Sequence, residues 1–95
     1  MTLAQLSERR AEILAVAEER GSSNVRVFGS VARAEAVEGC DIDFLVDLEP
    51  GRTLLDLGGL LMDLRDLLGH DVDVMPAENL RPRIANDVLA DAVAL

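Results

Sequence analysis

The residues of this chain that could do chemistry are a few aspartates, a glycine–serine pair and an arginine, set at the ends of apolar segments. Asp41 and Asp43 begin a strand-like segment, so their side chains share one face, with Cα atoms about 6.6 Å apart. Two bare carboxylates this close repel each other, and a divalent cation removes the repulsion. Mg²⁺ suits such a pair because it takes oxygen ligands, usually one or two carboxylates together with phosphates and water.

Asp73 is the candidate for a third carboxylate, since it lies in the middle of a later strand-like segment between two valines. A third carboxylate would complete a site for two metal ions about 3.5–4 Å apart, which clamps the attacking and leaving oxygens of a phosphoryl transfer. Asp71 shares this face and is an alternative, but the centre of a strand holds geometry better than its entrance. His70, just before this strand, is expected to be a loop residue rather than an acid–base group.

Gly29 and Ser30 fit the phosphate side of such a site. Glycine lets a phosphate approach the backbone closely, and the start of the helix that follows offers free N–H groups. The hydroxyl of Ser30 can donate to a phosphate oxygen. Arg33 lies three residues further along the same helical face and can reach the same anion. Each feature alone is common in structural turns and solvated strands, so the prediction rests on their order along the chain.

The elements that must position these residues alternate between helix and strand. Helices are expected at 2–20, 31–36, 53–68 and 81–90, and strands at 24–28, 41–48, 71–75 and 92–95. Capping boxes are expected at Thr2 with Gln5 and at Thr53 with Asp56, and Ser30 is expected to cap the helix 31–36. The order predicts an α+β fold, a single small mixed sheet with helices packed against it, as one domain over residues 1–95.

Two glycines interrupt the leucine-rich helix 53–68. Gly58 and Gly59 each cost about 1 kcal/mol relative to alanine in a helix interior. Close packing of this helix on the sheet is the expected compensation. The helix also carries an excess of apolar positions (Leu55, Leu60 and Leu67) that could serve a partner protein or a second copy.

The composition excludes several classes of function. The net charge is −9, and the nine basic residues are all arginine, so a basic footprint for direct nucleic-acid binding is absent. Cys40 is the single cysteine, which excludes an internal disulfide and fits a reducing compartment. No stretch approaches the roughly 20 apolar residues that cross a membrane, and no secretory signal is visible. The chain is therefore expected to be soluble and cytoplasmic.

The pair Gly29–Ser30, the run Asp41-Ile42-Asp43 and the distant Asp73 together resemble the nucleotidyltransferase fold of the DNA polymerase β superfamily, over residues 25–95. The small size is similar to that of the minimal nucleotidyltransferases of bacteria and archaea, the MNT-type antitoxins. These are commonly encoded beside a helical HEPN-type toxin. The resemblance implies a Mg²⁺-dependent protein adenylyltransferase that transfers AMP from ATP to a tyrosine of the toxin.

The same resemblance implies a role for each motif residue. Asp41 and Asp43 would hold Mg²⁺, with two ions in the active complex, and Asp73 would be the third carboxylate that activates the attacking hydroxyl. Three residues would hold the triphosphate: Gly29, Ser30 and Arg33.

Two positions depart from the family pattern. The family usually has glycine where this chain has Ala34, and serine where it has Cys40. These departures leave room for the first of two alternatives. The first is a non-catalytic antitoxin that neutralises its partner by binding and keeps a vestigial metal site. The second is a nucleotidyltransferase for small molecules. The chain could form a homo-oligomer or a hetero-oligomer.

Overall fold

The computed structural model describes residues 2–32, 41–79, 90 and 92–95. The expected alternation of helices and strands is confirmed in these ranges. Apart from Ala90, the expected helix 81–90 lies outside them, as does the end of the expected helix 31–36. No helix in the described ranges is long and apolar enough to span a membrane. The elements are α1 (Leu3–Glu8), α2 (Arg10–Glu19), β1 (Ser22–Phe28), α3 (Gly29–Ala32), β2 (Ile42–Leu48), α4 (Leu54–Leu68), β3 (Val72–Pro76), a 3₁₀ turn (Ala77–Asn79) and β4 (Val93–Ala94).

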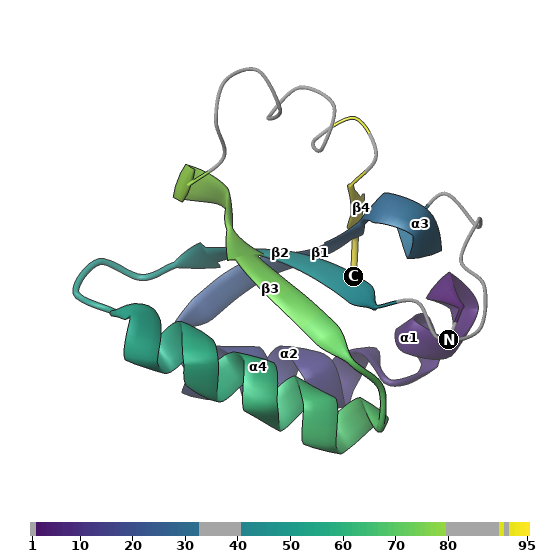
Figure 1. Cartoon of the computed structure of the whole chain (residues 1–95), viewed down its shortest axis with the longest axis horizontal. Coiled ribbons are helices and arrows are strands. Elements are labelled where there is room, and N and C mark those ends of the chain that lie inside the picture. Colours follow the sequence, from purple (N-terminus) through teal and green to yellow (C-terminus); the bar gives the residue numbers. More distant parts are fainter. Residues whose placement is uncertain (1, 33–40, 80–89, 91) are drawn as a thin grey trace.

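The strands form one small mixed sheet in the order β3-β2-β1-β4. β1 runs antiparallel to both β2 and β4, and β2 runs parallel to β3. Figure 1 shows α2 and α4 lying side by side across one face of this sheet. The arrangement confirms the expected α+β class. β2, β3, β4 and α4 each begin and end within one residue of the bounds that the sequence predicts.

Alternate residues of the strands face the helices and form the core. Along β2, the side chains of Ile42, Phe44 and Val46 are at most 1% exposed. Leu45, which points to the opposite face, is also fully buried. The other members of the core come from helices and strands alike: Leu6, Ile13, Ala17, Val25, Val27, Val31, Leu60, Leu64, Leu68, Val72 and Val74.

The first helix is interrupted, whereas the sequence predicts one helix over 2–20. Arg9 has φ −103° and ψ 16°, so α1 ends before it and α2 begins after it. The guanidinium of Arg9 donates to the carbonyl oxygen of Leu67, 2.7 Å away in the last turn of α4. Carbonyls in the last turn of a helix have no intrahelical partner, so this contact satisfies one and holds the interruption in place. The expected capping box of Thr2 and Gln5 is present.

The start of β1 and the start of α3 also differ from expectation. β1 begins at Ser22 rather than Asn24, and its register with β2 shifts near Asn24, which has φ 50°. Asparagine tolerates this left-handed region better than most residues, and its side chain donates to Oδ2 of Asp47 at 3.0 Å. α3 begins at Gly29, whereas the sequence predicts that this helix begins at residue 31.

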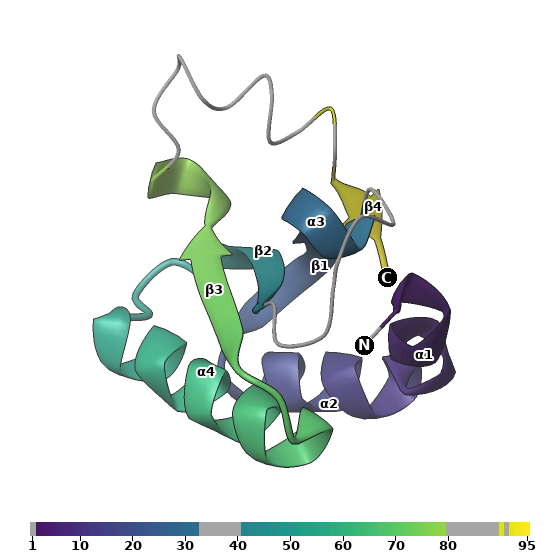
Figure 2. The same ribbon diagram turned by 45° about the vertical axis from the view of Figure 1, so that its right-hand side comes forward.

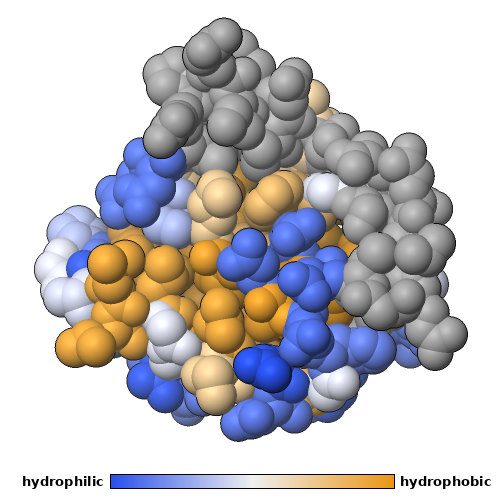
Figure 3. Space-filling model, in the orientation of Figure 1, coloured by the Kyte–Doolittle hydropathy of each residue, from blue (hydrophilic) through white to orange (hydrophobic). Residues whose placement is uncertain are grey.

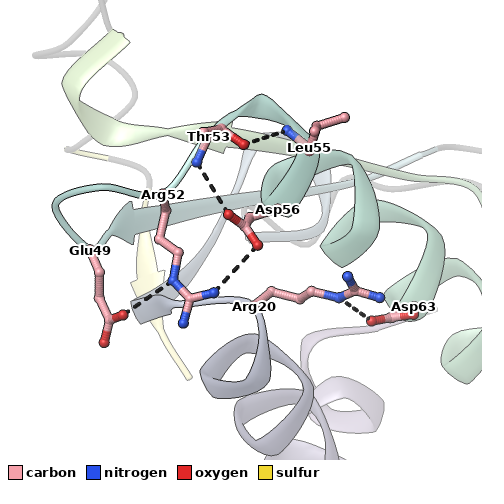
Figure 4. A network of polar contacts seen from close by, with 7 residues as sticks. All are labelled: Arg20, Glu49, Arg52, Thr53, Leu55, Asp56 and Asp63. Carbon is pink, nitrogen blue, oxygen red and sulfur yellow. Dashed lines mark hydrogen bonds and ion pairs between the residues drawn. The ribbon is translucent and has the colours of Figure 1, made fainter.

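Both ends of α4 are capped as the sequence predicts. Oγ1 of Thr53 accepts from the N–H of Leu55, and Oδ2 of Asp56 accepts from the N–H of Thr53, both at 3.2 Å (Figure 4). At the other end, Gly69 takes the left-handed conformation with φ 69°. Glycine adopts this conformation without the steric penalty of a Cβ atom.

The two adjacent glycines of α4 have different surroundings. A Cβ atom on Gly59 would lie 2.5 Å from Nη1 of Arg20, whereas one on Gly58 would meet nothing within 4 Å. The expectation that these glycines serve close packing of α4 on the sheet is therefore wrong, because Gly59 makes room for an arginine at the end of α2. Nε of Arg20 donates to Oδ2 of Asp63 at 2.8 Å (Figure 4). This hydrogen bond and the charge of Asp63 raise the pKa of Arg20 above its ordinary value.

We expect Gly58→Ala to stabilise the protein and Gly59→Ala to stabilise it less. Alanine is favoured over glycine in a helix interior by about 1 kcal/mol, and the space at Gly58 is open. At Gly59 the new methyl group must displace Arg20 and disturb its ion pair with Asp63, which offsets part of the gain. Urea unfolding at equilibrium measures both free energies. A gain at Gly59 equal to that at Gly58 would contradict the packing described.

Candidate active site

Strand ends that meet at one end of the sheet carry the residues expected to do chemistry. Because β1 is antiparallel to β2 and β2 is parallel to β3, the last residue of β1 lies near the first residues of β2 and β3. α3, whose first residue is Gly29, directly follows β1, and Asp41 directly precedes β2. Figure 2 shows α3 at the point where β1 ends. The topology thus gathers motifs that are far apart in the sequence.

Asp43 and Asp73 are direct neighbours on the paired strands β2 and β3. Neighbouring strands lie about 4.8 Å apart. Both side chains project from the face opposite the core, because residues next to them, such as Phe44 and Val74, are buried in that core. Asp43 is half-buried and Asp73 is exposed. Two of the three expected carboxylates therefore come together on one face.

The carboxylate of Asp43 lies against the backbone of Gly29. A Cβ atom on Gly29 would be 2.5 Å from Oδ2 of Asp43, and Gly29 has φ 73°. The close approach and the positive φ both call for glycine at this position. The turn that the sequence predicts to receive a phosphate therefore also makes room for a carboxylate.

The carboxylate of Asp73 is turned along its own strand. Its Oδ1 accepts from the backbone N–H of Val74 at 3.1 Å. Asp41, the first aspartate of the expected pair, is exposed just before β2. The N–H of the next residue, Ile42, donates to the carbonyl oxygen of Asp71 at 3.1 Å. Asp41 and Asp71 are therefore close to each other at the entrances of the two parallel strands.

Asp71, the alternative third carboxylate, lies at the rim of the site. Its Oδ1 is 3.3 Å from Nη2 of Arg65 on α4, and its side chain is 69% exposed. His70 is exposed in the bend between α4 and β3, where the sequence predicts a loop residue. The register of β3 with β2 therefore places Asp73, and not Asp71, beside Asp43.

The donor set at this end of the sheet suits a hard divalent cation. Asp41, Asp43 and Asp73 offer only carboxylate oxygens, and Mg²⁺ needs one or two of these when phosphates and water supply the rest. In the part of the chain that the structure describes, no three His, Cys, Asp or Glu side chains form a ready metal cluster. The bond to Val74 holds the carboxylate of Asp73 along β3. The assignment of these three aspartates as metal ligands stays a prediction.

Several expected site residues lie outside the described part of the chain. Arg33 is among them, as are Ala34 and Cys40, the two departures from the family pattern. Ser30 is a residue of α3, and the structure describes its backbone but not its side chain. Their expected roles therefore stay predictions from the sequence.

Arg26 shares the face of Asp43 and was not anticipated in the sequence. Its Nη2 donates to Oδ1 of Asp47 at 2.8 Å, and its side chain is 15% exposed. In the register of β1 with β2, Arg26 is paired with Leu45, two residues along from Asp43. The sequence does contain a signal for Arg26. It lies between two valines, and when both valines are buried in the core, the arginine between them lies on the opposite face. The ion pair closes the end of this face that lies away from the carboxylates.

Comparisons with known sequences agree with this arrangement. The sequence profile described as "Nucleotidyltransferase domain" matches residues 10–95. "Putative protein adenylyltransferase MJ0435" of Methanocaldococcus jannaschii is 35% identical over 88 residues, which cover 93% of this chain and 95% of the relative. "Protein adenylyltransferase MntA" of Thermococcus cleftensis is 41% identical over 76 residues, which cover 80% of this chain and 77% of the relative.

Solved structures show the same fold. One described as "Structure of putative minimal nucleotidyltransferase" matches 100% of this chain and 97% of its own, with a TM-score of 0.89 and 46% identity. Another, "Crystal structure of the toxin-antitoxin with AMP-PNP", matches 88% of this chain and 69% of its own, with a TM-score of 0.76. Its identity is 17%, so it shows a shared fold alone. Since the profile covers nearly the whole chain and both sequence relatives exceed 30% identity, the chain belongs to the nucleotidyltransferase domain family.

Proposed function

We propose that this nucleotidyltransferase transfers AMP from ATP to a hydroxyl group of a partner protein. The observation that carries the proposal is the placement of Asp43 beside Asp73, with Gly29 in close contact with Asp43. Such an arrangement of carboxylates and glycine can hold a metal-bound triphosphate. Protein as the acceptor is supported by the two relatives named as protein adenylyltransferases.

In this proposal the carboxylates hold metal and the glycine turn holds phosphate. Bound Mg²⁺, two ions in the active complex, would neutralise charge on the phosphates. The left-handed Gly29 lets the triphosphate approach the backbone, and Ser30 and Arg33 donate to its oxygens. The proposed metal ligands are Asp41, Asp43 and Asp73.

The proposed reaction is a single displacement at the α-phosphorus of ATP. A bond forms between the acceptor oxygen and the α-phosphorus, while the bond from that phosphorus to the oxygen bridging to the β-phosphate breaks. Pyrophosphate leaves with the electron pair, and the hydroxyl proton passes to the carboxylate of Asp73. Asp73 suits this role because it is exposed and can be reached by a side chain of another protein.

The partner that we propose is a HEPN-type toxin, which this protein would inactivate as an antitoxin in a hetero-oligomer. The sequence resemblance to minimal nucleotidyltransferases supports this partner, and so does the fold shared with a solved toxin–antitoxin structure. The net charge of −9 favours a partner with a basic surface. We also propose that residues 1–95 form a single minimal nucleotidyltransferase domain.

A second candidate function is neutralisation of the partner by binding alone. The exposed apolar side chains of α4 favour it, because Leu54, Leu55 and Met62 are 74%, 86% and 52% exposed. A partner protein can cover such a surface without any chemistry. The carboxylates would then be a vestigial metal site.

We expect Asp43→Asn to abolish transfer while the complex with the partner still forms. The substitution keeps the shape of the side chain but removes the charge that would hold the metal. Intact-mass spectrometry of the co-encoded partner, incubated with MgATP and this protein, should show one or more added adenylates. The variant should slow this addition by at least about 100-fold, as expected for losing a group that stabilises charge in the transition state.

Asp66→Asn is the matched control for that experiment. It removes one negative charge from an exposed position on α4 and should leave the rate of transfer unchanged. If the unmodified protein forms a stable complex but adds no mass to the partner, the catalytic proposal fails for ATP and that partner. Neutralisation by binding would then be favoured.

We expect Gly29→Ala to disable the site and not only to destabilise the fold. The alanine must adopt φ 73° and place its methyl group 2.5 Å from Oδ2 of Asp43. Gly69→Ala is the matched control, because Gly69 has φ 69° and a Cβ atom there would meet nothing within 4 Å. Both variants should lose about 1–2 kcal/mol of unfolding free energy from the left-handed conformation.

Only Gly29→Ala should also lose MgATP binding, measured by calorimetric titration, and transfer, measured by intact mass. Urea unfolding of both variants separates the loss of stability from the loss of function. Equal binding and transfer in the two variants would show that the contact between position 29 and Asp43 does not matter for the site.

A further inference from the structure

We propose that the free edge of β3 binds an extended segment of the acceptor protein as an additional strand, which delivers the hydroxyl side chain to Asp73. This inference rests on the proposed function, since it names the way in which the acceptor is recognised. Three features of the described residues support it: the backbone groups of β3 that point away from β2, the contact that Asp73 makes with one of them, and the apolar side of α4 next to this edge.

β3 is an edge strand, and no described strand pairs with its outer side. The N–H of Ile42 donates to the carbonyl of Asp71, so the odd-numbered residues of β3 direct their backbone groups toward β2. The backbone groups of Val72 and Val74 therefore point away from β2. Pro76 has no N–H to offer, so the free edge is short and ends there.

The outward N–H of Val74 is bonded to the side chain of Asp73 at 3.1 Å. A carbonyl oxygen of an added strand is an equivalent acceptor for that N–H, as in other cases of strand addition. Its arrival would release the carboxylate of Asp73 at the moment when an acceptor side chain lies beside it. Docking and the freeing of the proposed base are thereby one event.

An apolar side of α4 lies next to this edge. Leu54, Leu61 and Arg65 recur at helical spacing on the side of α4 opposite Asp63, the residue that Arg20 holds toward α2. Arg65 reaches Asp71 at the start of β3, which shows that this side of the helix faces the edge. Figure 3 looks onto the same side and shows hydrophobic surface over α4 beside β3.

An added strand would present alternate side chains to two different surfaces. One set would lie over Leu54 and Leu61 on α4, and the other would lie on the face of Asp43 and Asp73. The first surface calls for apolar side chains. The second calls for the acceptor hydroxyl flanked by basic residues, because it carries carboxylates and the whole chain has a net charge of −9. The occupant is thus a basic, extended segment in which apolar residues alternate with polar ones.

A nuclear magnetic resonance titration without nucleotide or metal tests docking separately from catalysis. The probe is the peptide Ac-Val-Arg-Val-Tyr-Val-Arg-Val-NH2, which has the required alternation. The amide signals of Val72 and Val74 should shift, and their hydrogen exchange should slow. The amides of Asp73 and Met75, which face β2, should change less. A control peptide with proline on both sides of the tyrosine keeps the charges but cannot form the ladder, and should have no effect.

Two neighbouring leucines provide the matched pair of variants. Leu54→Asp should weaken binding of the probe about tenfold, because it removes a leucine from the contact surface. Leu55→Asp should leave binding unchanged, since Leu55 is 86% exposed and lies one residue round the helix, away from β3. Neither side chain belongs to the core, so both variants are expected to fold.

The outcomes separate this inference from the proposed function. Unchanged amides of Val72 and Val74 at millimolar probe, or equal weakening by both substitutions, would overturn strand docking and leave the transfer of AMP untouched. Shifted amides and a selective effect of Leu54→Asp would support docking. The same result together with no added mass on the partner would sustain docking while the transfer proposal fails.

Discussion

The parallel pairing of β2 with β3 sets Asp43 beside Asp73, and the arrangement of the whole site depends on this register. A slip of one residue would turn the carboxylates toward the helices and bring core residues to the open face. The core opposes such a slip because Phe44 and Val46 are fully buried beneath α2 and α4. The leucines of α4 thus act on the chemistry indirectly, by keeping one strand from sliding past the other.

Two carboxylates on neighbouring strands repel each other when they lie directly opposite. The structure gives each of them a local contact that keeps it in place. Asp43 lies against the backbone of Gly29, and Asp73 accepts from the N–H of Val74. In the proposed function, Mg²⁺ that arrives with ATP adds positive charge beside the two carboxylates.

Most of the fold was predictable because its signals are local in the sequence. The leucine spacing of α4, with Thr53 before it and Gly69 after it, predicts both the helix and its ends. The features that were missed depend on residues distant in sequence. Arg9 interrupts the first helix where it reaches Leu67 of α4, and Gly59 makes room for an arginine of α2. No period or capping pattern reports such contacts, because each is decided only when the helices pack together.

The site was also predictable only in part, and the part that was missed bears on how the acceptor is recognised. Alternation along β3 predicts that Asp73 faces away from the core, but not that its carboxylate bonds to the free edge of its own strand. Proteins usually protect exposed strand edges against unwanted pairing. Among the described residues the protection of β3 is slight, since Pro76 ends the edge and a single side chain accepts from the N–H of Val74. That side chain belongs to the proposed catalytic base. A segment that takes over this hydrogen bond frees the base as it docks, which is how strand docking would favour an extended protein segment as the acceptor.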